Sequence, residues 1–484
     1  MVIKPDPDAQ IPAKIGRAHF IGIGGSGMSG IARMFLDAGV EVSGSDRSES
    51  DYTRNLRAAG AQVAIGHASE NLPENVDAVV VTSALWPDNP ELLAARDRGI
   101  TVLHRSQALV WLTQNSRLIA VAGAHGKTTS TGMIATALVE LGHDPSFVNG
   151  GVVAPLGTNE RRGSGSEFVV EADESDGSFL FYDVAIALIT NIDNDHLDHY
   201  GSVDAFQQAF VDFASGASEA VVLSADDELT VALHERLGHP RTVTFGASEN
   251  ADVRLLETTP MQGRTRLRIA VDGIEYEGEL AVPGFHNALN ATGAVAVLRE
   301  LGIDPADALR GLAAFSGTKR RFELHDTIDG VSVYDDYAHH PREVVAALTA
   351  AREVVGEGRI LAVHQPHLYS RTQAMSDEFA AAYETFADHT VVLDVDGARE
   401  DPVPGVTGEL VVREFKDPSR VDYRPDWAAA ATRVAEWTEP GDFVITFGCG
   451  NVNLIIPQLL EALHARAPRA SDSEAAGVAS GQAE

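Results

Sequence analysis

The segment Arg117–Leu141 constrains the fold of this chain more than any other. It reads RLIAVAGAHGKTTSTGMIATALVEL, in which residues 118–123 predict a buried parallel strand and residues 127–141 carry apolar side chains at helical spacing. The turn Gly123-Ala124-His125-Gly126 joins the two, and Gly142 follows as a C-cap. The pattern predicts a phosphate-binding loop, because free N–H groups and the helix dipole favour an anion at a helix N-terminus.

Side chains at the start of this helix would complete a nucleotide-phosphate site. Lys127 would reach the β- and γ-phosphates, and the Thr128 hydroxyl would bind Mg²⁺. The spacing departs from the common motif, because Val121 stands where the first glycine is expected. The alternative is a glycine-rich turn without a ligand, with Lys127 solvated. The position of the turn directly after an apolar strand favours phosphate binding.

Length, charge and cysteine content limit the class of protein and its partners. A chain of 484 residues predicts about three domains. Its 37 basic and 70 acidic residues give a net charge of −33, which disfavours nucleic acid and anionic membranes as partners. The single cysteine, Cys449, fits a reducing compartment, and the sequence shows neither a signal peptide nor an apolar run of about 18 residues. We therefore expect a soluble cytoplasmic protein.

Residues 1–115 predict a Rossmann-like domain. A strand enters the pattern Gly22-x-Gly24-x-x-Gly27, a helix follows, and a second strand ends at Asp46, about 20 residues beyond the glycines. This pattern predicts a diphosphate at the helix N-terminus and suits NAD, FAD or a UDP-sugar equally. A Rossmann unit without a ligand is the alternative.

Polar residues at or just past strand ends add candidates in this domain, namely His67, Ser83 and His104. Ligands collect at that edge of an α/β sheet, although each residue alone is more typical of a helix cap or the surface.

Residues 116–320 predict a central α/β domain of the P-loop ATPase type. Glu171-Ala172-Asp173-Glu174-Ser175-Asp176 ends an apolar strand, and another strand runs into Asp193-Asn194-Asp195-His196. Parallel strands deliver these groups to the edge that carries the phosphate loop, and oxygen ligands suit Mg²⁺. Glu171 and His196 are therefore metal-ligand candidates, whereas the aspartates fit a solvated loop as well. Residues 148–151 predict a glycine turn, residues 252–280 antiparallel strands, and residues 285–290 the first turn of a helix.

Residues 321–465 predict a third doubly wound α/β unit, which is again Rossmann-like. A strand that begins at Val331 and strands over 360–364, 391–394 and 443–447 lead into polar clusters that carry His and Arg. The Ala-, Ser-, Glu- and Gly-rich residues 466–484 predict a disordered tail.

Taken in order, these motifs resemble the Mur ligases over roughly residues 17–460. The resemblance rests on the segments HFIGIGGSGMS (19–29), GKTT (126–129), EADESD (171–176), TNI through His196 (190–196), His286-Asn287 with Asn290, RRF (320–322), DDY with HHP (335–341), and QPH with Arg371 (365–371).

The resemblance implies an ATP-dependent ligase that joins an amino acid to UDP-N-acetylmuramate in cytoplasmic peptidoglycan precursor synthesis. The lactyl carboxylate would attack the γ-phosphate of ATP, and the amine of L-alanine would attack the resulting acyl phosphate. Sister ligases that add later residues carry a carbamylated lysine about where Phe210 stands, so the chain is most similar to the alanine-adding branch. ATP and Mg²⁺ are implied, and monomer and homodimer stay open.

Site residues are carried over position by position. The UDP-sugar would meet Gly22, Gly24, Gly25, Ser26, Gly27, Asp46, His67, Ser83 and His125. ATP would meet Gly123, Ala124, His125, Gly126, Lys127, Thr128, Thr129, Asn287, Arg320, Arg321 and Asp336. The amino acid would meet Tyr337, His339, His367 and Arg371, and Mg²⁺ would meet Thr128, Glu171 and His196. Lys127, Glu171, His196 and His339 are the implied catalytic residues.

The chain departs from the family at two positions. Ala124 replaces a usual threonine, and Leu368 stands where some relatives have arginine, which leaves Arg371 as the candidate carboxylate clamp. Three other functions stay open: a sister ligase that reattaches recycled muropeptides, a nicotinamide-dependent dehydrogenase, and a regulatory nucleotide-binding protein without turnover. The choice among L-alanine, glycine and L-serine is also open.

Overall fold

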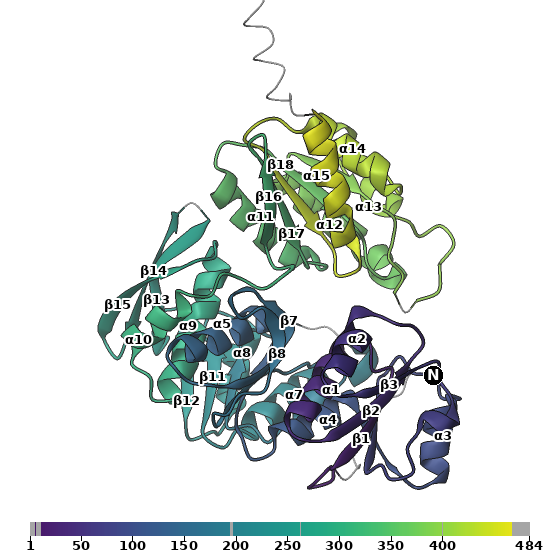
Figure 1. Ribbon diagram of the computed structural model, residues 1–484. Helices are drawn as coiled ribbons and strands as arrows, with labels where there is room; N and C mark the ends of the chain where they lie inside the picture. Colours follow the sequence, from purple (N-terminus) through teal and green to yellow (C-terminus); the bar gives the residue numbers. More distant parts are fainter. Residues whose placement is uncertain (1–4, 6–10, 194–196, 262, 399, 467–484) are drawn as a thin grey trace, which may run out of the picture. The chain divides into compact units, whose positions relative to one another are not determined.

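The structure is a computed structural model that describes residues 5, 11–193, 197–261, 263–398 and 400–466 (Figure 1). His196 and residues 467–484 of the predicted tail lie outside the described residues. The described residues form two compact units, which lie within residues 1–258, 266–280 and 287–316 for the first and within residues 259–265, 281–286 and 317–484 for the second. In the described part, no helix combines the length and apolarity needed to cross a membrane.

The first unit begins with a parallel sheet of order β3-β2-β1-β4-β5. Its elements are β1 (Arg17–Ile21), α1 (Ser26–Asp37), β2 (Glu41–Asp46), α2 (Asp51–Ala58), β3 (Gln62–Ile65), β4 (Ala78–Val81), α3 (Pro90–Asp97), β5 (Thr101–His104) and α4 (Arg105–Thr113). This order is the Rossmann arrangement that the glycine pattern predicts.

Alternation along the strands separates the two faces of this sheet. Phe20 packs in the cluster that contains α1, α2 and α4, whereas Ile21 packs with α3 on the opposite face. In Figure 1, α3 and α1 accordingly lie on opposite sides of β1.

A larger sheet of order β15-β14-β13-β12-β11-β10-β6-β9-β7-β8 follows. Its elements are β6 (Arg117–Ala122), α5 (Lys127–Glu140), β7 (Ser146–Val153), β8 (Thr158–Arg161), β9 (Glu167–Glu171), β10 (Ile186–Ile189), α6 (Leu197–Tyr200), α7 (Val203–Ser215), β11 (Ala220–Ser224), α8 (Glu228–Arg236), β12 (Thr242–Gly246), β13 (Val253–Met261), β14 (Arg264–Val271), β15 (Ile274–Leu280), α9 (Phe285–Glu300) and α10 (Pro305–Leu312). Strands β6, β9, β10, β11 and β12 run parallel.

Two details of this sheet bear on the predictions. The predicted glycine turn at 148–151 is wrong, because these residues lie within β7, which pairs with β9 and β8. The predicted antiparallel strands are confirmed for β14 and β15, since Asp272 and Gly273 join them in a tight turn with φ of 52° and 79°.

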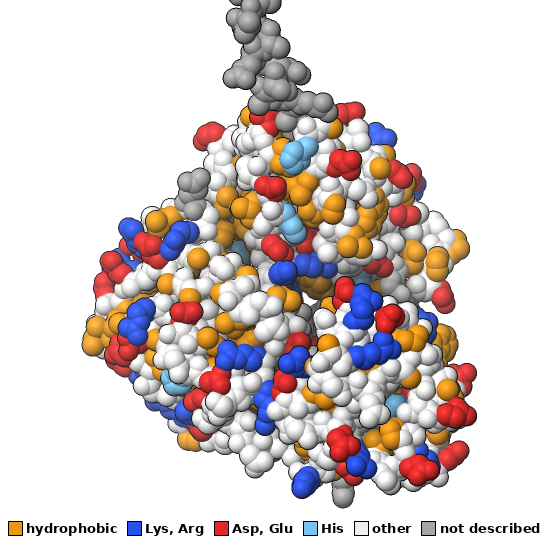
Figure 2. All heavy atoms as spheres, viewed as in Figure 1, with side chains coloured by type: hydrophobic (Ala, Val, Ile, Leu, Met, Phe, Trp, Pro, Cys, Tyr) orange, Lys and Arg blue, Asp and Glu red, His pale blue; other side chains and the backbone are white. Residues whose placement is uncertain are grey.

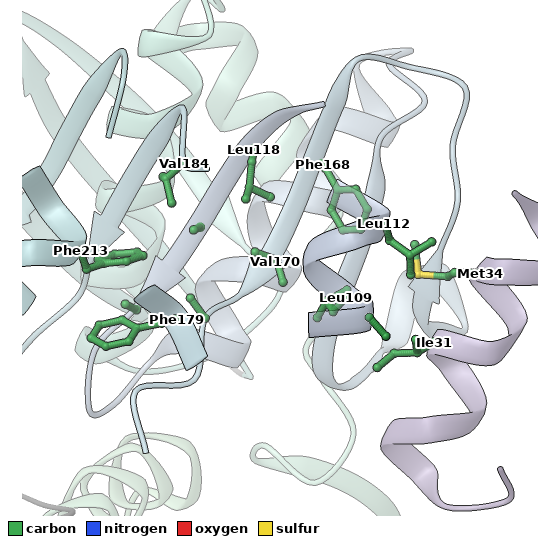
Figure 3. Packing of buried hydrophobic residues seen from close by; sticks show 14 of the residues in the cluster. Ile31, Met34, Leu109, Leu112, Leu118, Phe168, Val170, Phe179, Val184 and Phe213 are labelled. Atoms are coloured by element: carbon green, nitrogen blue, oxygen red, sulfur yellow. The ribbon is translucent and has the colours of Figure 1, made fainter. Parts of the chain in front are cut away.

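The two sheets of the first unit share one core. Figure 3 shows Leu109 and Leu112 of α4 between Ile31 and Met34 of α1 on one side and Phe168 of β9 on the other. All five side chains are at most 8% exposed and belong to one hydrophobic cluster. Helix α4 is therefore a core element of both sheets.

The second unit contains a sheet of order β16-β17-β21-β18-β19-β20, parallel except for β16. Its elements are β16 (Glu323–Ile328), β17 (Val331–Asp336), α11 (Pro341–Val355), β18 (Ile360–His364), α12 (Tyr369–Phe386), β19 (His389–Val392), α13 (Glu409–Arg413), β20 (Val421–Tyr423), α14 (Trp427–Trp437), β21 (Phe443–Phe447) and α15 (Ile456–Arg466). Helices α11 to α13 cover one face, and α14 and α15 cover the other. Within the two units, short 3₁₀ helices join neighbouring elements. They cover residues 69–71, 154–156, 178–181, 418–420 and 452–455.

The predicted α/β fold with doubly wound sheets is confirmed. Figure 2 shows acidic side chains spread over the face in view and interspersed with Lys and Arg.

Candidate active site

The turn between β6 and α5 requires glycine at two positions. Gly123 has a φ of 129°, and a Cβ there would lie 2.3 Å from Thr190 Oγ1. Gly126, the N-cap of α5, has a φ of 84°, and a Cβ there would lie 2.6 Å from Asn290 Oδ1. Side chains at these positions would be strained and would collide, so the turn depends on glycine.

The end of β10 holds this turn in place. Asn191 Oδ1 accepts a hydrogen bond from the His125 N–H at 2.9 Å, and Asn191 Nδ2 donates to the His125 carbonyl at 2.9 Å. Thr190 Oγ1 donates to the same carbonyl at 2.6 Å. The His125 ring lies 3.7 Å from the carboxylate of Asp193. The backbone at the start of α5 is therefore fixed before any anion binds.

Lys127 is folded over the loop. Its Nζ donates to the carbonyls of Gly123 and Ala124 and forms an ion pair of 2.9 Å with Glu174, whose side chain is 3% exposed. Burial alone would lower the pKa of Lys127, but the carboxylates of Glu174 and Glu171 outweigh it and raise that pKa. Lys127 is therefore a fully charged ammonium with a buried counter-ion.

Thr128 and Glu171 meet beside it. Thr128 Oγ1 donates to Glu171 Oε1 at 3.0 Å, and the Gly150 N–H donates to Glu171 Oε2 at 2.7 Å. A Cβ at Gly150 would lie 2.6 Å from Glu171 Oε2, so glycine in β7 lets the carboxylate lie against the backbone. The structure thus brings together a hydroxyl and a carboxylate, the oxygen ligands that Mg²⁺ takes. Among the described residues, no group of three or more His, Cys, Asp or Glu side chains is arranged to hold a metal by itself.

A second glycine loop lies between β1 and α1. Gly22 has a φ of 80°, and its N–H donates to the Ser45 carbonyl. The Gly24 N–H donates to Asp46 Oδ2 at 2.8 Å, and a Cβ at Gly24 would lie 2.7 Å from the Thr53 side chain. Gly25 is the N-cap of α1, and Ser26, whose side chain is outside the described set, begins the helix. Asp46 therefore shapes the loop that leaves the helix N-terminus for an anion.

Ser83 and His104 lie together at the ends of β4 and β5. Ser83 Oγ lies 2.8 Å from His104 Nε2, and His104 Nδ1 lies 2.8 Å from Ser106 Oγ. Burial and the neighbouring Arg105 lower the pKa of His104 to about 4, so the ring is neutral at pH 7. His104 is also the N-cap of α4, so it has a structural role of its own.

Arg105 is a candidate that the sequence reasoning missed. Its Nη1 would lie 3.5 Å from a Cβ at Gly27, which puts a cation beside the glycine loop. Sequence alone places this arginine only as a helix residue after β5, and the signal that could have found it is its position just past a strand end.

In the second unit, Arg320 and Arg321 differ in their surroundings. The Arg320 guanidinium donates to the carbonyls of Gly448 and Gly450 and pairs with Asp335 at 3.1 Å. The Arg321 guanidinium lies 4.9 Å from the centre of the Tyr337 ring, and it makes no hydrogen bond within the described residues. Arg321 is therefore the one whose donors can meet a ligand.

Asp336 ends β17 as a buried carboxyl group. Its oxygens accept hydrogen bonds from the N–H groups of Phe322 and Ala338 at 2.7 and 2.8 Å. Burial raises the pKa of Asp336 to about 6, although Arg321 and the two N–H groups oppose the rise.

Two histidines and an arginine follow in the same unit. The rings of His339 and His367 are 6.4 Å apart, and His339 Nδ1 lies 3.3 Å from Glu343. Burial lowers the pKa of His339 to about 4, with Arg371 acting in the same direction and Glu343 against it. Arg371 is the third residue of α12 and half-buried. The predicted amino-acid residues therefore gather in one unit.

Of the remaining predicted ATP residues, Thr129 lies on the first turn of α5, and Asn287 is buried on the first turn of α9; both belong to the first unit. Sequence reasoning did not single out Glu174 or Gly150. Glu174 was one of four carboxylates in a row, and only the fold shows which one faces Lys127.

Three segments of the chain match models of one protein family. Residues 17–117 match "Mur ligase family, catalytic domain", residues 121–298 match "Mur ligase middle domain", and residues 320–450 match "Mur ligase, glutamate ligase domain". The chain belongs to the Mur ligase family, as the resemblance predicted.

Particular relatives narrow the comparison. The chain is 60% identical over 462 residues to the protein named UDP-N-acetylmuramate–L-alanine ligase of Clavibacter sepedonicus, with 96% of each chain covered. The crystal structure named UDP-N-acetylmuramate-alanine ligase MurC of Thermotoga maritima matches with a TM-score of 0.77 at 29% identity, covering 94% of this chain and 100% of that one. A murein peptide ligase of Psychrobacter arcticus shares the fold, with a TM-score of 0.67 at 23% identity and coverage of 93% and 99%.

Proposed function

We propose that this chain is the ATP-dependent ligase that joins L-alanine to the lactyl carboxylate of UDP-N-acetylmuramate, in cytoplasmic peptidoglycan precursor synthesis. One observation carries the proposal: the chain is 60% identical over nearly its whole length to a relative with that name. The phosphate loop and the gathered histidines and arginine of the second unit support it independently. The nicotinamide-dependent alternative leaves the Lys127, Thr128 and Glu171 arrangement without a role.

The proposal assigns one substrate to each part of the chain. Residues 1–115 bind the UDP-sugar on the loop between β1 and α1, with Asp46, Ser83 and His67 at neighbouring strand ends. Residues 116–320 bind ATP on the loop between β6 and α5. Residues 321–465 bind L-alanine and contribute Asp336 and Arg321 to the binding of ATP. His125 would face the muramyl group.

In the first half-reaction the lactyl carboxylate attacks the γ-phosphate of ATP, ADP leaves, and an acyl phosphate forms. The N–H groups at the start of α5 and the Lys127 ammonium stabilise the charge on the phosphates. The phosphates would take over hydrogen bonds that Lys127 now makes with loop carbonyls, while Glu174 keeps the ammonium charged. Catalysis here is positioning and charge stabilisation, and both come from a loop that β10 already holds.

Thr128 and Glu171 would hold one Mg²⁺, and His196 would serve a second. The two oxygen donors fit an ion that completes its shell with water and phosphate oxygens. When bound, the ion would neutralise phosphate charge.

In the second half-reaction the amine of L-alanine attacks the acyl carbon, and the tetrahedral intermediate collapses to the amide with release of inorganic phosphate. Arg371 would hold the carboxylate of the amino acid by a planar two-point contact. His339 is neutral at pH 7 because burial lowers its pKa to about 4, so it can accept a proton from the amine. Tyr337 and His367 would line the same site.

A coupled assay of phosphate release tests the proposal. With ATP, Mg²⁺ and UDP-N-acetylmuramate, we expect release with L-alanine and little release with the L-alanyl-γ-D-glutamyl-diaminopimelate tripeptide. Faster release with the tripeptide would indicate the sister ligase. ATP binding without release in either mixture would indicate the regulatory protein, and tight binding of NADH by fluorescence would indicate the dehydrogenase.

A further inference from the structure

Glu91 is a buried carboxylate at the centre of a polar network in the first domain. Its side chain is fully buried, and its Oε2 accepts hydrogen bonds from His19 Nε2 at 2.8 Å and Ser45 Oγ at 2.6 Å. Its Oε1 accepts from the Ala68 N–H and Asn71 Nδ2, both at 3.0 Å. One residue at the start of α3 thus joins β1, β2 and the loop that follows β3.

Every partner of Glu91 has to be a donor. Burial would raise the pKa of Glu91, but the hydrogen bonds from His19, Ser45 and Asn71 outweigh burial and lower it to about 2. The group is therefore an ionised carboxylate, which accepts hydrogen bonds and donates none.

This network decides which nitrogen of His67 carries the proton. The Ser45 hydroxyl has one hydrogen, which it donates to Glu91, so Ser45 Oγ acts as the acceptor in its 2.8 Å contact with His67 Nδ1. Glu91 Oε1 lies 3.5 Å from the same Nδ1 and favours a proton there as well. In a neutral imidazole with Nδ1 protonated, Nε2 is a hydrogen-bond acceptor.

The acceptor atom lies at the nucleotide edge of the sheet. His67 follows Gly66 at the end of β3, the strand next to β2, and the register pairs Asp46 with Ile65. A diphosphate at the start of α1 puts the ribose at the end of β2, so the base attached to that ribose extends over the end of β3. The His67 side chain is 18% exposed, and its Nε2 makes no hydrogen bond in the described part of the chain.

We propose that His67 Nε2 accepts a hydrogen bond from N3–H of the uracil base, and that Glu91 and Ser45 are positioning residues that fix the required tautomer. The proposal rests on the proposed function, because it needs a uridine nucleotide in the first domain. Uracil presents a donor at N3, whereas cytosine presents a lone pair there, which would face the lone pair of Nε2. The network would therefore select the base as well as support the fold.

The tautomer is tested in the ligand-free protein. Two-dimensional ¹H–¹⁵N spectra of ¹⁵N-histidine-labelled protein distinguish protonated from unprotonated ring nitrogens, and His67→Phe identifies the His67 signals among the 17 histidines. We expect the neutral ring of His67 to carry its proton on Nδ1. A neutral ring with its proton on Nε2 would overturn the proposal.

The base selection is tested by calorimetric titration with UDP and CDP. We expect wild type to bind UDP at least about tenfold more tightly than CDP, about 1.4 kcal/mol, because the Nε2 acceptor would face a lone pair of cytosine and stay unpaired. His67→Phe and Ser45→Ala should each reduce this ratio to about threefold or less. Ser43→Ala is the matched control, because Ser43 contacts the other branch of the network through His19 Nδ1 at 2.9 Å. That variant should keep the wild-type ratio.

The outcomes separate this proposal from the proposed function. If wild type binds UDP over CDP but His67→Phe and Ser45→Ala keep the full ratio, the role of His67 is wrong while the function stands. The same conclusion follows if Ser43→Ala lowers the ratio as much as Ser45→Ala, since the network would then act only through stability. If wild type binds neither nucleotide, the UDP-sugar assignment fails first.

Discussion

Lys127 and Glu174 form a buried pair, and this changes what a substitution at Lys127 should do. From sequence, Lys127 serves the ligand alone, so its loss would leave stability almost unchanged. In the structure its removal strands the Glu174 carboxylate, which is 3% exposed. Breaking a buried ion pair from one side costs about 3–5 kcal/mol.

We therefore expect Lys127→Met to lower both activity and stability. Phosphate release should fall by at least about 10²–10³-fold. The free energy of unfolding in urea should fall by about 3 kcal/mol, and Lys127→Met with Glu174→Gln should recover most of it while staying inactive. A single variant as stable as wild type would show that the pair contributes nothing.

Arg371 tests the amino-acid site. Lysine keeps the charge but loses the planar fork, so Arg371→Lys should raise the KM for L-alanine by at least about tenfold, or 1.4 kcal/mol. The KM values for ATP and UDP-N-acetylmuramate should stay near wild type. Arg413→Lys is the matched control, because among the described residues the Arg413 side chain makes only an exposed pair with Glu409 on α13. If both variants changed the KM for L-alanine by the same small factor, Arg371 would be a surface residue without a role in binding the amino acid.

At the scale of elements, the last residue of β17, Asp336, has a carboxyl group that should make stability depend on pH. The pKa of Asp336 is raised by burial from 3.8 to about 6. The folded protein thus holds this proton more tightly than the unfolded chain does, so the stability it contributes is present below about pH 4 and is lost as pH rises through about 6. A shift of about two units corresponds to roughly 3 kcal/mol.

Urea unfolding of wild type and Asp336→Asn between pH 4 and 7 measures this contribution. We expect the free energy of unfolding of wild type to fall by up to about 3 kcal/mol relative to the variant as pH rises across this window. Parallel pH profiles for the two proteins would contradict the raised pKa.

Most elements could be predicted from the sequence, because apolar runs and glycine turns are local signals. The strands over 360–364 and 443–447 have the predicted bounds. The prediction of a turn at 148–151 is wrong. Gly150 lies in the strand β7, and glycine is needed there because the side chain of Glu171, which is distant in sequence, lies against its backbone. The antiparallel edge strand β16 gave no signal, since its exposed, polar residues show little alternation.

The candidate site shows the same limit. Motifs locate the loops, but pairings across the sheet decide roles. Glu174 rather than its neighbours faces Lys127, and Arg320 is tied to backbone carbonyls while Arg321 is not. No spacing rule carries that information, because it depends on which strand ends are neighbours.

On the scale of the whole molecule, α4 joins the two sheets of the first unit. Leu112 is 4% exposed between them, so Leu112→Ala should lower the free energy of unfolding of that unit by about 2–4 kcal/mol. In calorimetry the effect should fall on the transition of the first unit and leave that of the second unit in place. Leu93→Ala, on α3 and 45% exposed, is the control and should change stability by less than about 1 kcal/mol. A shift of both transitions by Leu112→Ala would contradict independent units.

The shared core also limits how this protein can be recombined. A chimera in which residues 1–115 come from another ligase would keep both nucleotide loops. It would, however, replace Ile31, Met34, Leu109 and Leu112 by the side chains of that ligase, and Phe168 would then face a surface that it does not fit. Residues 1–115 therefore cannot be exchanged as an independent module. Engineers who wish to graft a new sugar-nucleotide specificity should exchange the strand-end loops and leave α1 and α4 with the sheet they pack against.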